Sequence, residues 1–250
     1  MYRGNEVTGV IQARMGSTRL PNKVLMELAG RPVIWHVIER LKSVEGLDEI
    51  IVATSTKACD DLLADYIEQL DEPGVDIFRG PEQDVLKRFY LALEKSPTDL
   101  VVRVTGDSPL VCPHHLQKML HHIVEHRLDG VDAHREKTGL TLGLGSEVYH
   151  HQALVDAHLL SACPVEREHV SLFIKRRPRA FRVEYPAPER ELCSDYRLTL
   201  DYPDDYRLLR TIYQEMYRPG CIVDCRRVLD WLRSRPQVAQ VNADCIQKSP

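Results

Sequence analysis

The first half of the chain alternates short apolar runs with segments whose apolar residues recur at helical spacing. The apolar, β-prone runs cover residues 7–13, 49–54, 75–78 and 100–105. The helical segments cover residues 32–44, 60–70 and 84–93. Such alternation predicts an α/β fold with a mostly parallel, mixed sheet flanked by helices on both faces. Because ligands of such sheets bind at the carboxyl ends of the strands, we expect the polar loops after these strands to form one site.

The second half of the chain has a less regular pattern. Residues 125–149 carry four glycines among short apolar pieces, which favours extended strands and a flap. The pattern predicts helices over 152–161, 166–175 and 204–217 and strands over 181–185 and 196–200; the polar stretch after Arg235 gives no assignment. We therefore expect a single domain over 1–250, in which about 130–190 form a smaller flap or dimerisation subdomain.

Composition and charge narrow the function classes. With 250 residues and 43% hydrophobic content, the chain can bury one full core. Its net charge of −4 gives no overall basic surface, so no nucleic-acid partner is expected. No apolar run approaches the ~20 residues that span a bilayer, and the N-terminus lacks a hydrophobic signal region. The seven cysteines suit free thiols in a reducing compartment. We expect a cytoplasmic protein with no membrane partner, in which Cys221 and Cys225 are structural.

A basic loop follows the first predicted strand directly. Arg14, Arg19 and Lys23 supply three cations, and Gly16 and Ser17 supply close backbone approach and a hydroxyl donor. Within this loop Pro21-Asn22 predicts a turn in which Asn22 takes a positive φ. The loop matches neither the Walker nor the G-x-G-x-x-G pattern. It predicts binding of a nucleoside triphosphate or a similar anion, with a solvated basic loop as the alternative.

Two aspartates follow predicted strands that are far apart in the chain. Asp107 comes after the strand 100–105, and Asp201 comes after the run 196–200. Mg²⁺ bound to a triphosphate prefers one or two carboxylates, phosphate oxygens and water. The pair predicts a metal site, with turn or helix-cap roles as the alternative.

Two further groups of residues favour solvated surfaces. Five histidines crowd the predicted helix around residues 114–126, and His122 and His126 have the i, i+4 spacing of a metal pair. No third ligand is apparent in the sequence, so we expect a solvated helix face. Lys175-Arg-Arg177 is likewise expected to be a solvated helix end.

Six segments in order resemble one protein family. They are QARMGSTRLPNK (12–23), VAT (52–54), FRG with DVL (78–80 and 84–86), TGDSPL (105–110), EREHV (166–170) and RLTLD (197–201). Together they resemble the spore-coat polysaccharide biosynthesis cytidylyltransferase-like proteins, which are related to the acylneuraminate and 3-deoxy-manno-octulosonate cytidylyltransferases. The resemblance spans about residues 7–215.

The resemblance implies a nucleotide-diphospho-sugar transferase fold and an Mg²⁺-dependent transfer of CMP from CTP to an acidic sugar, releasing pyrophosphate, for surface glycan biosynthesis. It implies Arg14 and Lys23 as catalytic residues and Asp107 and Asp201 as metal ligands. The implied nucleotide-binding set is Ala13, Arg14, Gly16, Ser17, Arg19, Lys23, Thr54, Ser55, Arg79, Gly80, Asp84 and Thr105. The implied acceptor-binding set is Arg103, Glu147 and His169. Relatives are often dimers, so a homodimer is an expectation as well.

Two departures from the family leave alternatives open. Asn22 stands where the family has glycine, which its tolerance of positive φ permits. The family stretch Gly-Leu-Asp-Val-Glu-Val-Phe is GLGSEVY (143–149) here, which loses an aspartate and keeps Glu147. A sugar phosphate or phosphonate acceptor, a glycosyltransferase and a non-enzymatic nucleotide-binding regulator remain alternatives. His169 has an alternative of its own, a helix-surface pair with Glu166.

Overall fold

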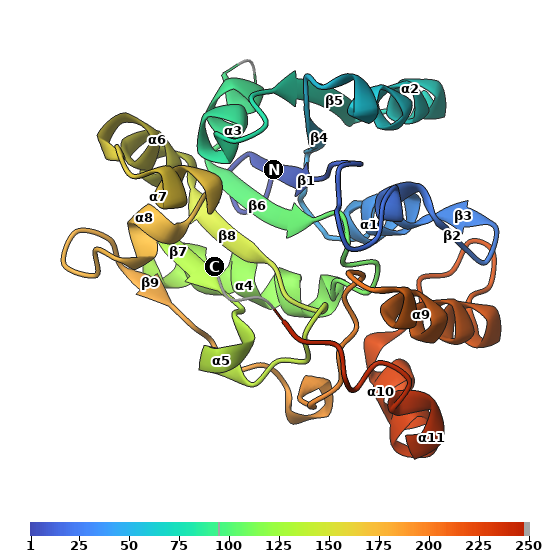
Figure 1. Ribbon diagram of the computed structural model, residues 1–250. Coiled ribbons are helices and arrows are strands. Elements are labelled where there is room, and N and C mark those ends of the chain that lie inside the picture. The colour runs from blue at the N-terminus through green and yellow to red at the C-terminus, as the bar shows by residue number, and fades with distance from the viewer. Residues whose placement is uncertain (95, 248–250) are drawn as a thin grey trace.

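A seven-stranded sheet forms the centre of the molecule (Figure 1). The computed structural model describes residues 1–94 and 96–247. The strands lie in the order β5 (Val75–Gly80), β4 (Glu49–Ser55), β1 (Val7–Gln12), β6 (Leu100–Thr105), β8 (Glu147–His150), β7 (Gly130–Asp132) and β9 (Val183–Glu184). Only β8 runs antiparallel to its neighbours among them. The mostly parallel, mixed sheet is therefore confirmed.

Helices and short elements complete the fold. The α-helices are α1 (Val33–Lys42), α2 (Asp61–Leu70), α3 (Val85–Leu93), α4 (Pro113–His126), α5 (Arg135–Thr138), α6 (His151–Leu160), α7 (Pro164–Glu168), α8 (Leu172–Lys175), α9 (Pro203–Met216), α10 (Cys225–Arg233) and α11 (Pro236–Ala239). Three 3-10 turns, η1 (Lys23–Leu25), η2 (Ala58–Asp60) and η3 (Arg190–Leu192), and a small hairpin of β2 (Glu27–Leu28) and β3 (Arg31–Pro32) lie between them. No helix in the described residues is both long and apolar enough to span a membrane.

Alternation along the strands creates two cores, one on each face of the sheet. On β1, Val7 and Ile11 join the core formed with α1, α2, α4, α9 and α10. Val10 points the other way, into the core formed with α3, α6 and α8. Both cores are continuous along the sheet, so the strand ends are held rigidly on both sides.

Two segments differ from the expected pattern. The predicted helix over 166–175 is two short helices, α7 and α8, with a break at 169–171. The predicted strand over 196–200 is wrong, because its backbone pairs with two separate loops and not with one neighbouring strand. Leu198 N–H donates to the Leu142 carbonyl at 2.8 Å, and Leu200 N–H donates to the Asp107 carbonyl at 2.9 Å. These bonds bring the end of this segment beside the loop that follows β6.

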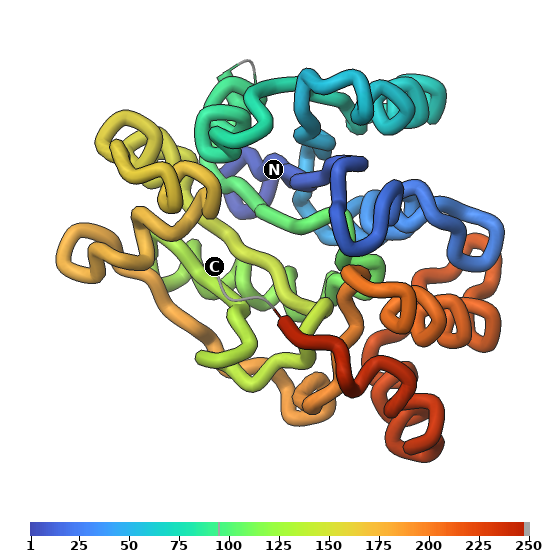
Figure 2. The backbone as a smooth tube through the Cα atoms, viewed as in Figure 1, coloured from blue at the N-terminus to red at the C-terminus, as the bar shows by residue number. Residues whose placement is uncertain are grey.

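The segment from 130 to 190 belongs to the central sheet. It supplies β7, β8 and β9, which extend the sheet beyond β6. The C-terminal chain, which the sequence left unassigned, forms α11 and then turns back toward the strand ends (Figure 2). The C-terminal chain thereby contacts Arg197, four residues before Asp201.

Candidate active site

The basic loop between β1 and η1 is folded back on itself. The carbonyl oxygen of Met15 accepts hydrogen bonds from Ser17 N–H at 2.8 Å and from Asn22 N–H at 3.2 Å. Asn22 has φ 59° and ψ 17°, which confirms the left-handed turn expected from Pro21-Asn22. This turn leads directly into η1, where the Lys23 side chain begins.

Asp60 fixes the position of this loop from a neighbouring strand end. Its carboxylate is buried and accepts a hydrogen bond from Met15 N–H at 2.6 Å and another from Ser55 N–H at 3.2 Å. The loops after β1 and β4 are thus tied to one side chain. The sequence predicts Asp60 only as the start of a helix, because nothing local shows that its carboxylate reaches Met15, 45 positions away.

Two aspartates share the ammonium group of Lys23. Lys23 Nζ lies 2.5 Å from Asp107 Oδ2 and 2.9 Å from Asp201 Oδ1. Arg19 Nη2 approaches the same Asp201 oxygen at 2.9 Å. Burial by itself would lower the pKa of Lys23, but attraction to Asp107 and Asp201 outweighs burial and raises this pKa. Burial by itself would raise the pKa of Asp201, but the positive charges of Lys23, Arg19 and Arg197 outweigh burial and lower this pKa. Residues from three distant segments therefore form one charged cluster.

A second set of buried residues holds Asp201 in place through hydrogen bonds. Arg197 donates through Nη2 to Asp201 at 2.6 Å and through Nε to Asp205 at 3.0 Å. Asp205 also accepts the backbone N–H of Asp201 at 2.9 Å, and Asn242 donates to Asp205 at 2.7 Å. Asp205 and Asn242 are not among the residues predicted for the site from the sequence. The four-residue spacing from Arg197 to Asp201 and Asp205 was a usable signal, whereas Asn242 carried none.

The nucleotide-side candidates lie at the ends of β4 and β5. Thr54 and Ser55 are fully buried, and the Thr54 hydroxyl has no hydrogen-bond partner within the described residues. Arg79 spans the two strand ends, donating to the Ser55 carbonyl at 3.1 Å and to Asp61 at 2.6 Å. At Gly80, a Cβ would lie 2.8 Å from Phe78 and 2.9 Å from Arg88, so a larger residue would not fit without movement. The strand ends are thus closely packed.

The other candidate nucleotide-binding residues differ in their exposure and in their protein partners. Arg14 and Gly16 are exposed, and Ala13 is buried. The Thr105 hydroxyl lies 3.1 Å from that of Ser108. Asp84 has two protein partners, since it caps α3 by accepting Lys87 N–H at 3.0 Å and pairs with Arg167 at 2.7 Å. The Asp84 carboxylate therefore has a structural function in the protein itself.

A second charged cluster lies where β6, β7 and β8 meet. Arg103 pairs with Glu147 at 3.1 Å, and Lys175 pairs with Glu147 at 2.8 Å and with Asp132 at 2.6 Å. Burial opposes ionisation of Glu147, but Arg103 and Lys175 outweigh it and lower the pKa of Glu147 to about 2. Burial and the nearby Glu147 raise the pKa of Asp132. The expectation that Lys175 ends a solvated helix is wrong, because its side chain is only 20% exposed and joins this cluster.

Comparison with known proteins shows which family the chain belongs to. The family model described as Cytidylyltransferase matches residues 8–221, from β1 past the end of α9. This chain belongs to the cytidylyltransferase family. The match includes every residue of both charged clusters except Asn242.

Two proteins similar to this cytidylyltransferase-family protein align with almost the whole chain, and a third aligns with less than half of it. It is 35% identical to the spore coat polysaccharide biosynthesis protein SpsF of Bacillus subtilis, over 94% of this chain and 97% of that one. It is 37% identical to a 3-deoxy-manno-octulosonate cytidylyltransferase of Anaeromyxobacter, but over only 46% of each chain. A solved cytidylyltransferase of Leptospira borgpetersenii superposes with a TM-score of 0.86 at 25% identity, covering 98% of this chain and all of that one. The nucleotide-diphospho-sugar transferase fold is confirmed by such structural neighbours.

His169 lies at the break between α7 and α8. The carboxylate of Glu166 accepts from Ser161 at 2.9 Å and from Arg177 at 3.0 Å, and within the described residues it forms no hydrogen bond with His169. The alternative of a Glu166–His169 surface pair is therefore wrong.

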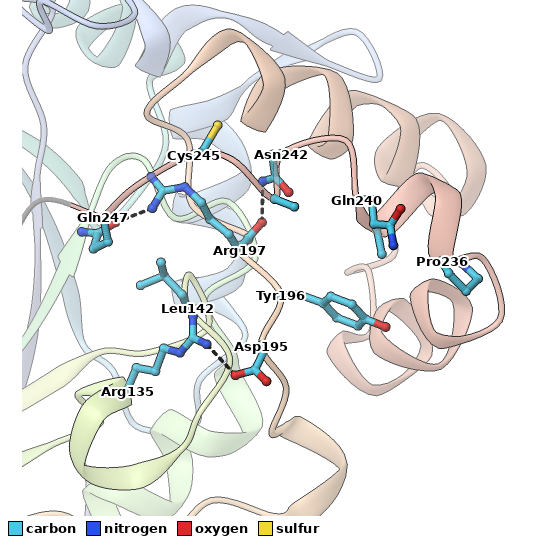
Figure 3. A pocket seen from close by; sticks show the side chains of 12 residues that line it. Arg135, Leu142, Asp195, Tyr196, Arg197, Pro236, Gln240, Asn242, Cys245 and Gln247 are labelled. Carbon is cyan, nitrogen blue, oxygen red and sulfur yellow. Dashed lines mark hydrogen bonds and ion pairs between the residues drawn. The ribbon is translucent and has the colours of Figure 1, made fainter.

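A pocket of about 430 Å³ lies beside Arg197 (Figure 3). Arg135 and Asp195 form an ion pair at 2.8 Å on one side of it. On the other side, Asn242 donates to the Arg197 carbonyl at 2.9 Å, and Gln247 accepts from the Arg197 guanidinium at 2.5 Å. The C-terminal segment of this cytidylyltransferase-family protein therefore covers the arginine that supports Asp201.

Proposed function

We propose that this protein transfers CMP from CTP to an acidic sugar or a similar anionic acceptor and releases pyrophosphate. The observation that carries the proposal is the ammonium of Lys23, which ends the basic loop and is shared by Asp107 and Asp201. This arrangement joins a loop suited to a triphosphate with two carboxylates suited to a divalent cation. The match to cytidylyltransferases, including a synthetase complexed with CTP, supports cytosine as the base of the nucleotide.

The carboxylates fit Mg²⁺ by their chemistry. Asp107 and Asp201 converge on one cationic group, and their oxygens are hard ligands of the type that Mg²⁺ prefers. In the proposed reaction Asp107 and Asp201 hold Mg²⁺, which when bound would offset charge on the phosphate oxygens. Lys23, Arg19 and Arg197 keep Asp201 ionised, and Asp205 helps to orient it by accepting its backbone N–H.

Transfer consists of an in-line displacement at phosphorus. A hydroxyl oxygen of the acceptor forms a bond to the α-phosphorus and releases its proton to water, the bond from that phosphorus to the bridging oxygen breaks, and pyrophosphate leaves with the electron pair. Arg14 and Lys23 would offset the charge that develops on the leaving group, while Gly16 and Ser17 would contact phosphate oxygens. The loop can act through position and charge without a covalent nucleophile.

The second charged cluster supports an acceptor that carries both a carboxylate and hydroxyls. Arg103 and Lys175 can pair with an acid group, and Glu147 and Asp132 can accept hydrogen bonds from hydroxyls. His169, near this cluster in sequence, is proposed as a further acceptor contact. The relation to a spore coat polysaccharide protein supports a role in surface glycan synthesis.

Pyrophosphate release tests the proposal directly. The purified protein should be assayed with each of the four nucleoside triphosphates against sugar acids, sugar phosphates and phosphonates, with Mg²⁺ and with a chelator. We expect release with CTP and a sugar acid, and no release with the chelator. Absence of CTP turnover with every acceptor would refute the proposal. Hydrolysis of CMP-sugars without synthesis would favour a glycosyltransferase instead.

A further inference from the structure

The outer face of α4 carries two histidines beside a glutamate of the edge strand β9. His122 and His126 are one helical turn apart, so their rings lie on the same face, with centroids 4.2 Å apart. β9 pairs with β7, against which α4 packs, and this brings Glu184 to the same place. The prediction that His122 and His126 have no third candidate ligand is therefore wrong.

The three side chains have the geometry of a shared site. His122 Nε2 lies 2.7 Å from Glu184 Oε2, and the ligand atoms of His122, His126 and Glu184 all lie within 4.8 Å of one another. His122 and Glu184 are partly buried, whereas His126 is exposed. A small ion could therefore be reached by all three ligands and still keep a solvent-facing position.

We propose that His122, His126 and Glu184 bind a divalent transition metal of the zinc class. Two imidazole nitrogens and one carboxylate oxygen suit Zn²⁺, which takes three protein ligands with water in its fourth position. The same set does not suit Mg²⁺, which prefers oxygen ligands in octahedral geometry. This site shares no residue with the Lys23 cluster and does not depend on the proposed reaction.

The other histidines of α4 have separate partners. His121 pairs with Glu125 at 3.0 Å, and His114 pairs with Glu189 at 2.9 Å. His115 is buried in the protein, and burial lowers its pKa to about 4. Among the histidines of this helix, only His122 and His126 converge as a pair on one carboxylate from another element.

The metal would join a short edge strand to a long helix. β9 has only two residues and pairs with β7 alone among the described strands, so its position depends on few backbone bonds. A metal bridging Glu184 to α4 would hold this edge in place. Because binding to the folded state alone raises stability, the site would increase the melting temperature when filled.

Titration of the full chain without an affinity tag tests this proposal. Zn²⁺ competition against a chromophoric chelator should show one site that is lost in His126→Ala and unchanged in His121→Ala. His121 is the matched control because it is a partly exposed histidine on the same helix that pairs with Glu125. We expect the His126→Ala change to weaken binding by more than roughly 10-fold, the lower range found for disturbing an outer-shell partner.

Two further measurements separate this site from other zinc ligands. Co²⁺ substitution should give no intense thiolate charge-transfer band, since no cysteine takes part. Zn²⁺ should raise the melting temperature of the wild type and of His121→Ala, but not of His126→Ala or Glu184→Gln. Equal zinc affinity in His126→Ala and His121→Ala, or a thiolate band that persists in both, would overturn the proposal.

Discussion

Lys23 Nζ lies 2.5 Å from Asp107 Oδ2, although 84 residues separate the two in the chain. The ammonium is held where the carboxylates converge, and it is protonated at neutral pH because its pKa is raised. Lys23 thus offsets part of the negative charge of Asp107 and Asp201. This relationship makes Lys23 the residue whose removal should affect chemistry most directly.

We expect Lys23→Met to lower the rate of pyrophosphate release by about 10²–10³-fold, because removal of one group that stabilises transition-state charge typically costs that much. Lys42→Met is the matched control, since Lys42 is a surface residue paired with Glu39 and Glu72. The raised pKa means that the ion-pair contribution of Lys23 is present below pH 10.5 and disappears only as pH rises above it. Turnover within two-fold of wild type would contradict the assignment.

Asp60 should be required for the shape of the phosphate loop. In Asp60→Asn, one of the two acceptor oxygens that hold Met15 and Ser55 becomes an amide donor, which faces a backbone N–H. We expect a loss of about 1–3 kcal/mol in the free energy of unfolding, typical of an unsatisfied buried group, and a raised KM for CTP. Urea denaturation and initial rates measure the two effects. Asp65→Asn, at an exposed position on α2, should leave KM nearly unchanged; equal effects would argue against a special role for Asp60.

Asn242 should act on the site through Arg197 and Asp205. Asn242→Ala removes one buried hydrogen bond to each of these residues. We expect about 1–3 kcal/mol lower stability and a reduced kcat with little change in KM for CTP. Gln240→Ala changes an exposed residue of the same segment and serves as the control. An unchanged kcat in Asn242→Ala would show that the tail does not position Asp201.

Gly143 should tolerate no side chain. Its φ is +96°, and a Cβ would lie 2.4 Å from the carbonyl carbon of Leu198. Gly143→Ala should therefore cost more stability than Gly139→Ala, where φ is +76° but no atom lies within 4 Å. For Gly139→Ala we expect about 1–2 kcal/mol from the left-handed backbone alone. Thermal unfolding of the two variants compares them, and similar melting temperatures would contradict the steric argument.

Glu147 should contribute to stability above the acidic range only. Because its pKa in the folded state is lowered to about 2, its contribution is present above pH 4.5 and is lost as pH falls from about 4.5 to about 2. The stability difference between wild type and Glu147→Gln should therefore shrink over this interval. Urea midpoints measured across it provide the test. A difference that stayed constant down to pH 2 would show that Glu147 is not held ionised by Arg103 and Lys175.

The strands and helices of the first half could be predicted because each depends on its own pattern. The run at 100–105 is β6 with the expected ends, and α2 differs from its predicted start by one residue. The segment at 196–200 failed because its apolar alternation is satisfied by packing and by hydrogen bonds to two loops, without a partner strand. The prediction for Lys175 was wrong because runs of charged residues are usually solvated. The Lys175 side chain is largely buried here because β7, β8 and α8 meet around it.

Local pattern by itself determined the β-α order, the parallel sheet, the left-handed Asn22 and the basic loop at a strand end, because alternation and turn chemistry act over a few residues. Tertiary structure alone decided which charges meet. Lys23 reaches Asp201 across 178 positions, Asp60 holds Met15 across 45, and Glu184 lies against His122 across 62. These contacts depend on the order of the strands in the sheet. They also require charged groups to lie within a few ångströms of one another. The spacing of residues along the chain encodes neither condition.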